Sequence, residues 1–367
     1  MNRLGKIIVF AVAISIIGIG GYFVFRWFTA PTNQQNRLTL SDNQAGITAT
    51  EAIKTLTDER LFDFWTNPKT EEVYYIGLHG QISKMNSDGS AQLLSSQTIP
   101  NLDYVNPTVD GSAVLIAFGY PTTPSFSIFN MAKRNFQPLP QGTTAADWNP
   151  QTNTSIAYLQ NNGSSGKLST LDLNTGKSTE LLKINQKDLI LDWAFPEIIY
   201  LYEKPTSQAV SSVWVYDIKS KTIKKLTEEK DFMVKWWTEK SLGLKWSTGK
   251  LSLVTKTNQQ IASTDLKTLP YKCFFDEPFI YCSAPNDLSG APANGLADRM
   301  LKKPRANDET IYAIISFNLG EKPLFSASKI FDSVEIGFRF RAKKIEKRNN
   351  RLLILNEDDN KLYTLPF

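Results

Sequence analysis

An aromatic or apolar residue recurs along the chain at intervals of about 40 to 45 residues, each time beside a polar turn and a short apolar run. These anchor residues are Trp65, Val105, Trp148, Trp193 and Trp236. After Val105, Asp110 and Gly111 supply the positive-φ positions of a tight turn, and the apolar run 113–118 is too short for a buried helix. The spacing is the one expected of four-stranded β-propeller blades, so the sequence predicts an all-β propeller.

The number of blades comes from continuing the alignment. A sixth unit starts at Leu269 and a seventh at Asp332, but the seventh has room for only three strands. The N-terminal segment AIKTLTDERLFDFW parallels TIKKLTEEKDFMVKWW at 222–237, so we expect Ala52 to Leu56 to supply the missing outer strand. Such closure removes an exposed sheet edge. Seven blades are predicted; a six-bladed ring remains an alternative, because the sixth unit is irregular.

The repeats also carry a resemblance to a known family. NPTVDGSAVLIAF, from Asn106 to Phe118, resembles the WSPDG signature of TolB-like propeller repeats, which are WD-repeat-like, and DWNPQTNTSIAYL is a looser match without the Asp-Gly pair. The resemblance covers residues 50 to 367. It implies a propeller fold and, as in that family, a periplasmic scaffold or a non-catalytic domain, but it does not identify a partner.

The N-terminal segment has the composition of a membrane anchor. Residues 7–25 are apolar or Gly apart from Ser15, and about 19 residues at 1.5 Å per residue nearly cross a hydrocarbon core of roughly 30 Å. A cleaved signal peptide is the alternative, although the apolar run exceeds the usual length. Arg3 and Lys6 precede the segment, which favours a cytoplasmic N-terminus for residues 1–6. Residues 26–50 are expected to be a flexible linker and 51–367 an extracytoplasmic propeller.

Most familiar catalytic and cofactor patterns are absent from the sequence. His79 is the single histidine, in a turn of the first repeat, and there is no HExxH, GxSxG, P-loop or dinucleotide-binding glycine pattern. We therefore expect no catalytic residues, no metal site and no cofactor. The net charge of +5 is mild and spread along the chain, so no nucleic acid partner is expected.

Cys273 and Cys282 are the only two cysteines. If Glu277 and Pro278 form a two-residue hairpin turn, the two cysteines lie opposite each other on neighbouring strands, at a spacing that a disulfide can bridge. An extracytoplasmic location permits oxidation, whereas two buried thiols are the alternative.

Charged residues beside the anchors are the candidates for a site in the central channel. They are Asp63, Asp103, Asp147, Asp192, Lys235, Lys272 and Glu335. Because innermost strands line the channel of a propeller, these side chains could hold a cation or a polar ligand. The alternative is that they pair with one another, with backbone amides or with water.

Two surface segments are candidates for partner binding. Residues 283–310 form the longest break in the repeats, between the second and third strands of the sixth blade. The run RFRAKKIEKRNNR, in a hairpin of the last blade, offers Arg339, Arg341, Lys343, Lys344, Lys347 and Arg348 to an anionic partner. Both can also be ordinary solvated segments.

The sequence thus predicts a membrane-anchored, extracytoplasmic propeller that binds envelope proteins or a cell-wall polymer without catalysis. Rigid faces built from loops suit this role because little conformational freedom is lost on binding. The alternative is a propeller enzyme, a carbohydrate lyase or hydrolase that uses the channel carboxylates. An enzyme would need at least two of these carboxylates to converge with perturbed ionisation.

Overall fold

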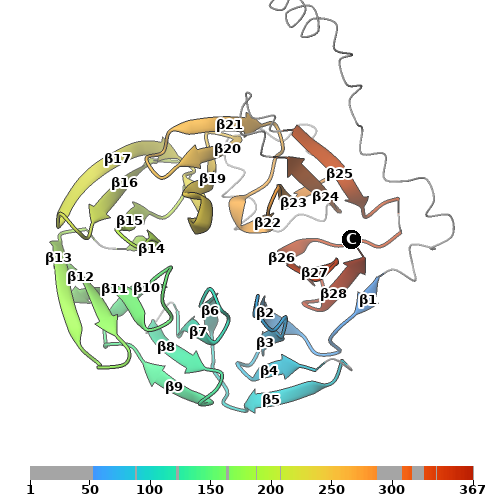
Figure 1. Ribbon diagram of the computed structural model, residues 1–367, viewed down its shortest axis with the longest axis horizontal. Helices are drawn as coiled ribbons and strands as arrows, with labels where there is room; N and C mark the ends of the chain where they lie inside the picture. Colours follow the sequence, from blue (N-terminus) through green and yellow to red (C-terminus); the bar gives the residue numbers. More distant parts are fainter. Residues whose placement is uncertain are drawn as a thin grey trace, which may run out of the picture. The chain divides into compact units, whose positions relative to one another are not determined.

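The computed structural model describes residues 53–86, 89–120, 124–162, 165–186, 188–206, 208–286, 308–315, 326–335 and 337–366. They form seven four-stranded antiparallel sheets arranged around a central axis (Figure 1). The all-β fold and the count of seven blades are therefore confirmed. The anchor segment 7–25 and the linker 26–50 lie outside the described residues.

The strands of blades one to four are arranged in chain order. Blade one contains β2 (Leu61–Thr66), β3 (Val73–Gly77), β4 (Ile82–Met85) and β5 (Ala91–Ser95). Blade two contains β6 (Leu102–Pro107), β7 (Ala113–Phe118), β8 (Ser125–Asn130) and β9 (Asn135–Pro138). Blade three contains β10 (Thr143–Trp148), β11 (Ser155–Asn162), β12 (Ser165–Asp172) and β13 (Ser178–Ile184). Blade four contains β14 (Leu189–Phe195), β15 (Ile198–Glu203), β16 (Val210–Asp217) and β17 (Thr222–Lys230).

The remaining three blades include two short 3₁₀ turns. Blade five contains β18 (Met233–Trp237), η1 (Thr238–Lys240), β19 (Leu242–Ser247), β20 (Lys250–Thr255) and β21 (Gln260–Thr264). Blade six comes after η2 (Pro270–Lys272) and contains β22 (Cys273–Asp276), β23 (Phe279–Pro285), β24 (Glu309–Ile315) and β25 (Ser326–Asp332). Blade seven contains β26 (Ala342–Arg348), β27 (Arg351–Asn356), β28 (Leu362–Pro366) and β1 (Lys54–Thr55).

Within each blade we call the strands A to D from the axis outward. The turns from A to B and from C to D lie on one face of the propeller, here the AB face. The turns from B to C, and the connections from D to the next A strand, lie on the opposite face, here the BC face. The A strands and the AB face carry most of the candidate residues.

Burial falls from the B strands to the D strands, and the sequence pattern reflects it. All five residues of β3 are buried, and so are the first five of β7, because B strands are covered on both sides by neighbouring blades. In contrast, the outer strand β17 is largely exposed and reads TIKKLTEEK. Continuous apolar runs therefore mark B strands, and polar runs mark D strands.

The ring closes between the two ends of the propeller. Lys54 and Thr55 of β1 pair with Thr364 and Tyr363 of β28, so an N-terminal strand completes blade seven. The expected fourth strand is thus confirmed. Closure of this kind pairs the edge of β28 that would otherwise be open.

The turn between β6 and β7 differs from the expectation in one respect. Gly111 adopts a positive φ of 67°, whereas Asp110 does not. The Asp110 carboxylate instead accepts hydrogen bonds from the Ser112 backbone N–H at 3.0 Å and the Thr108 hydroxyl at 2.8 Å. A Cβ on Gly111 would lie 2.9 Å from the carbonyl oxygen of Thr66 in blade one. Glycine is therefore required both by the backbone conformation and by close packing between blades.

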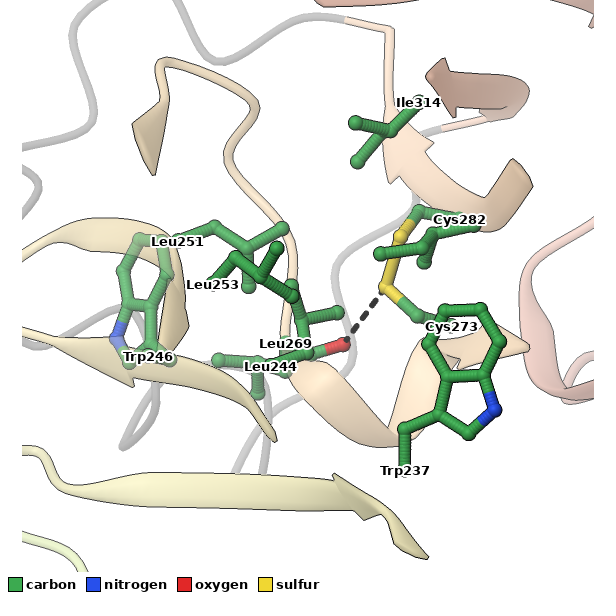
Figure 2. Close-up of a cluster of buried hydrophobic side chains, with 10 residues drawn as sticks. Trp237, Leu244, Trp246, Leu251, Leu253, Leu269, Cys273, Cys282 and Ile314 are labelled. Carbon is green, nitrogen blue, oxygen red and sulfur yellow. Dashed lines mark hydrogen bonds between the residues drawn. A yellow bond between two sulfur atoms is a disulfide. The ribbon is translucent and has the colours of Figure 1, made fainter. Parts of the chain in front are cut away.

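Blades five and six pack through the cysteine hairpin. Cys273 and Cys282 lie opposite each other on β22 and β23, across the turn at Glu277 and Pro278, and a disulfide joins them. In Figure 2 this disulfide lies with the Trp237 side chain on one side and the Ile314 side chain on the other, and leucines of blade five lie next to it. Both cysteines are buried, so the disulfide is part of the core between these blades.

Candidate functional site

Asp147 connects the inner strands of three consecutive blades. Its Oδ1 accepts hydrogen bonds from the backbone N–H of Trp148 at 2.9 Å and from the side-chain amide of Asn106 at 2.6 Å. Its Oδ2 accepts a hydrogen bond from the backbone N–H of Trp193 at 2.7 Å. The donors belong to β6, β10 and β14, so the carboxylate holds these A strands in register around the axis.

Asp192, on the neighbouring A strand, forms an acid pair with Asp147. Burial raises the pKa of Asp147 to about 6, in spite of the backbone and side-chain hydrogen bonds that lower it. Burial and then the charge of Asp147 raise the pKa of Asp192 well above its usual range. The two carboxyl groups hydrogen-bond to each other, which requires that one of them carries a proton that the pair shares.

Two tyrosines border the acid pair. Tyr104, on β6, is 43 % exposed, yet burial and then the charges of Asp147 and Asp192 raise its pKa well above the usual range. A side chain that is both solvent-exposed and close to carboxylates of two other blades must face the central axis. Burial and then the charge of Asp192 also raise the pKa of Tyr202. Both hydroxyls therefore stay protonated.

A second charged group joins blades seven and one on the inner strands. Lys344 Nζ lies 3.3 Å from Asp63 Oδ1 and 3.2 Å from Glu346 Oε1, and it donates to the backbone oxygen of Phe64 at 2.5 Å. Glu346 Oε2 accepts a hydrogen bond from the Thr66 hydroxyl at 2.9 Å. Burial lowers the pKa of Lys344, but the charges of Asp63 and Glu346 outweigh burial and raise it overall.

Lys235 lies on β18, and burial lowers its pKa by more than the carboxylates around it raise it. Its Nζ donates to the backbone oxygen of Cys273 at 2.6 Å and lies 6.0 Å from the ring centroid of Phe275. Burial, and then the charge of Lys344, lower its pKa to about 8. The group is therefore mainly protonated at pH 7.

Two of the seven predicted channel residues, Lys272 and Glu335, lie outside the inner strands. Lys272 is in η2 and forms a buried ion pair with Glu309, with 2.5 Å between Nζ and Oε1. Glu335 is 69 % exposed in the connection before β26 and pairs with Lys329. Asp103 does lie on an inner strand, β6, and is exposed at the bulge of that strand. Lys272 and Glu335 were placed wrongly because the alignment put inner strands where the chain forms connections.

The basic run 339–351 is mostly the innermost strand β26 rather than the tip of a hairpin. Lys343 Nζ donates to the backbone oxygen of Phe62, and Lys347 Nζ pairs with Asp276 at 2.5 Å. Arg341 pairs with Asp358 at 2.6 Å, and the exposed Arg339 lies 3.5 Å from Asp308. The partners of this run are thus largely groups of the propeller itself.

Two neighbouring cavities open at the centre of the AB face, and together we call them the central trough. The larger has a volume of about 700 Å³ and is lined by Lys235, Trp236 and Phe275, among others. The smaller has a volume of about 520 Å³ and is lined by Thr66, Asp276 and Arg348, among others. Val109, Phe274 and Glu346 line both, so the trough is continuous. Volumes of this size are typical of ligand sites.

Trp236 takes its place in the trough because the residue opposite is glycine. Trp236 pairs with Gly243 of β19, and its ring stacks on Tyr200 with 4.5 Å between centroids. A Cβ at position 243 would lie 2.6 Å from Cε3 of Trp236.

We expect Gly243→Ala to displace the Trp236 ring and lower the free energy of unfolding by about 1–3 kcal/mol. Denaturant unfolding followed by tryptophan fluorescence measures this change. Gly77→Ala is the matched control, because a Cβ there meets only ordinary contacts at 3.4 Å or more. Equal stability of the two variants would contradict the tight approach of Trp236 to β19.

Sequence reasoning missed Tyr104, Asn106, Tyr202 and Glu346 as neighbours of the charged groups. One usable signal was the position directly before four of the five anchors, which holds Tyr104, Asp147, Asp192 and Lys235. These residues face the axis on successive A strands. Glu346 is the single acid in the basic run 339–351, and no local pattern links it to Thr66, 280 residues away.

Some predicted features lie beyond what the structure describes. Most of the insertion, residues 287–307, falls outside the described ranges; its two ends confirm only that it connects β23 to β24. Among the described residues no helix is long and apolar enough to span a membrane. In the same residues, no group of three or more His, Cys, Asp or Glu side chains is arranged to hold a metal ion.

Comparisons with known proteins agree on the fold. No protein-family model and no curated protein sequence matches the chain. An oligogalacturonate lyase in complex with manganese aligns with a TM-score of 0.56 and 11% identity, covering 86% of this chain and 93% of that chain. The Cps50 (Swd1) propeller domain of Myceliophteria thermophila also has a TM-score of 0.56, at 9% identity over 86% of this chain and 99% of that chain.

TolB is also among the similar structures. The Acinetobacter baumannii protein aligns at 15% identity and a TM-score of 0.40, over 55% of this chain and 53% of that chain. At these identities the comparisons bear on architecture and not on chemistry. Together with the seven four-stranded sheets, the lyase and Cps50 alignments establish that the described residues of this chain form a seven-bladed β-propeller.

Proposed function

We propose that this protein is a membrane-anchored scaffold that binds an envelope protein or polymer on the AB face of its propeller without catalysing a reaction. The observation that carries the proposal is the central trough, a continuous depression lined by aromatic and charged side chains of several blades. Because these side chains stand on paired strands, binding there orders few additional groups. The apolar segment 7–25 supports an anchor with the propeller on the extracytoplasmic side.

An enzyme that uses the channel carboxylates is the second candidate, favoured by the convergence of Asp147 and Asp192 with raised pKa values. Their geometry argues against glycoside hydrolysis by a carboxylate pair. That chemistry needs the two groups roughly 5 Å or more apart, with the substrate between them, whereas these carboxyl groups hydrogen-bond directly to each other. Both oxygens of Asp147 are also engaged by N–H donors of the protein. We therefore favour a structural role for this pair.

Photocrosslinking from each face tests the proposal in intact cells. A photoreactive amino acid replaces Val109, which is 62 % exposed and borders the trough, or Leu78, which is 38 % exposed in the turn between β3 and β4 on the BC face. We expect specific adducts with an envelope component from position 109 and fewer from position 78. Adducts with cytoplasmic proteins, or equal labelling from both positions, would contradict the proposed orientation and binding face.

A further inference from the structure

We propose that the ligand of the central trough is a carboxylate-bearing polysaccharide, with Lys235 and Arg348 as its two cationic contacts. The inference rests on the proposed function and names the class of ligand for the same face. It depends on which charges in the trough already have partners, and on where the remaining ones lie.

Most carboxylates of the trough are paired within the protein. Glu346 contacts Lys344 and Thr66, Asp276 pairs with Lys347, and Glu197 pairs with Lys256 at 3.0 Å. Two further carboxylates, of Glu71 and Glu239, are exposed on the A-to-B turns at the rim, where water solvates them. The inner lining therefore offers no free carboxylate among the described residues.

Two cations of the lining have no counter-ion among the residues that the structure describes. Lys235 donates only to a backbone carbonyl, that of Cys273, and no described carboxylate lies within ion-pair distance of its Nζ. Arg348 is half-buried, and its Nε is covered by the protein but makes no hydrogen bond within the described part of the chain. A partly buried cation without a partner is costly, and an anionic ligand that supplies the partner would offset this cost.

The positions of the two cations favour an extended ligand. Lys235 lines the larger cavity and Arg348 the smaller one, so a single small anion in one cavity leaves the other cation unpaired. A chain with an acidic group on successive units can satisfy both. Guanidinium and ammonium groups both bind carboxylates through charge-assisted hydrogen bonds.

The surface between the two cations favours saccharide rings. Phe274 lines both cavities, and Phe275 and Trp236 line the larger one. Aromatic faces pack against the C–H groups of a pyranose ring, while its hydroxyl groups remain free to hydrogen-bond to polar neighbours such as Thr66. An acidic peptide is the competing occupant, and a peptide probe in the titration separates it from the polysaccharide.

Calorimetric titration of the full chain in detergent micelles tests the inference. The probes are a hexamer of uronic acid, a neutral hexamer of glucose and hexaglutamate. We expect the uronic acid hexamer to bind, and to bind at least tenfold more tightly than either of the other probes. Lys235→Met and Arg348→Gln should each reduce its affinity at least tenfold. Lys225→Met, which removes the same charge from the exposed outer strand β17, should leave it unchanged.

Three results would overturn the inference: equal binding of the uronic acid and glucose hexamers, tighter binding of hexaglutamate, or unchanged affinity in both trough variants. Circular dichroism and thermal unfolding of each variant show whether a loss of affinity reflects misfolding, and Arg348→Gln provides a second variant on a different blade.

If crosslinking from position 109 succeeds while the uronic acid hexamer does not bind, the ligand class is wrong and the proposed function stands. If both fail, the proposed function is also wrong.

Discussion

Replacement of Glu309 by alanine is expected to lower the free energy of unfolding by about 3–5 kcal/mol, the largest effect of any substitution considered for this protein. The Lys272 and Glu309 side chains are 6 % and 3 % exposed, and their ion pair joins η2 to β24. Glu309 also accepts hydrogen bonds from the Ser283 hydroxyl at 2.7 Å and from the backbone N–H of Ala342, in blade seven, at 2.9 Å. Its removal leaves a buried ammonium group and two buried donors without partners.

Chemical denaturation followed by tryptophan fluorescence measures this loss. Glu335→Ala serves as the control, since it removes a carboxylate from an exposed ion pair and should produce no measurable change. The double variant Lys272→Met, Glu309→Gln should be less destabilised than the sum of its single substitutions, because it removes the unpaired charge. A cost below about 1 kcal/mol for Glu309→Ala would mean that the pair is not buried as described.

Asp192→Asn is expected to gain stability relative to the natural chain as the pH rises from about 4 to 8. In the natural chain, the raised pKa values of Asp147 and Asp192 mean that the folded state retains protons that the unfolded state releases. Their contribution to stability is therefore complete below pH 4 and is lost as the pH rises through the folded-state pKa. An asparagine amide does not ionise, yet it can still donate a hydrogen bond to Asp147.

The stability difference between Asp192→Asn and the natural chain is expected to increase steadily from pH 4 to pH 8, because the raised pKa of Asp192 disfavours its ionisation in the folded state. Thermal unfolding at a series of pH values measures it. The nearby Tyr104 and Tyr202 stay neutral throughout this range. Asp103→Asn, a change of the same type at an exposed position, is the control for the loss of one carboxyl group. A similar pH dependence for Asp192→Asn and the natural chain would show that the carboxyl groups do not share a proton.

The fold was predictable from the sequence because the period of the repeat is local information. Each blade repeats an anchor residue, a polar turn and a buried strand, and the counterpart of β17 at the start of the propeller identified β1 as the closing strand. The opposed positions of Cys273 and Cys282 were predictable from the two-residue turn between them. In each case the residues that carry the signal are close in sequence or belong to equivalent positions of the repeat.

The charged groups around the axis were predictable only in part. Five predicted residues lie on inner strands as expected: Asp63, Asp103, Asp147, Asp192 and Lys235. Lys272 and Glu335 were wrongly placed there. Turns of regular length preserve the register of a repeat from blade to blade. Glu335 follows the long insertion of the sixth blade, and the register of the segments after an insertion cannot be counted from the earlier repeats. Lys272 precedes the insertion and lies in η2, a 3₁₀ turn directly before β22 that the repeat alignment did not predict.

The sequence by itself determined the propeller architecture and predicted both seven blades and the closure of the ring, because these depend on hydrophobic periodicity and turn chemistry within each repeat. The structure decided between seven blades and six. Only the tertiary structure decided which charges meet: Asp147 with Asp192, Lys344 with Asp63 and Glu346, and Lys272 with Glu309. Most of these pairs come from different elements, several of them distant in sequence, and their ionisation depends on burial and separation in space. Neither property can be read from the order of residues along the chain.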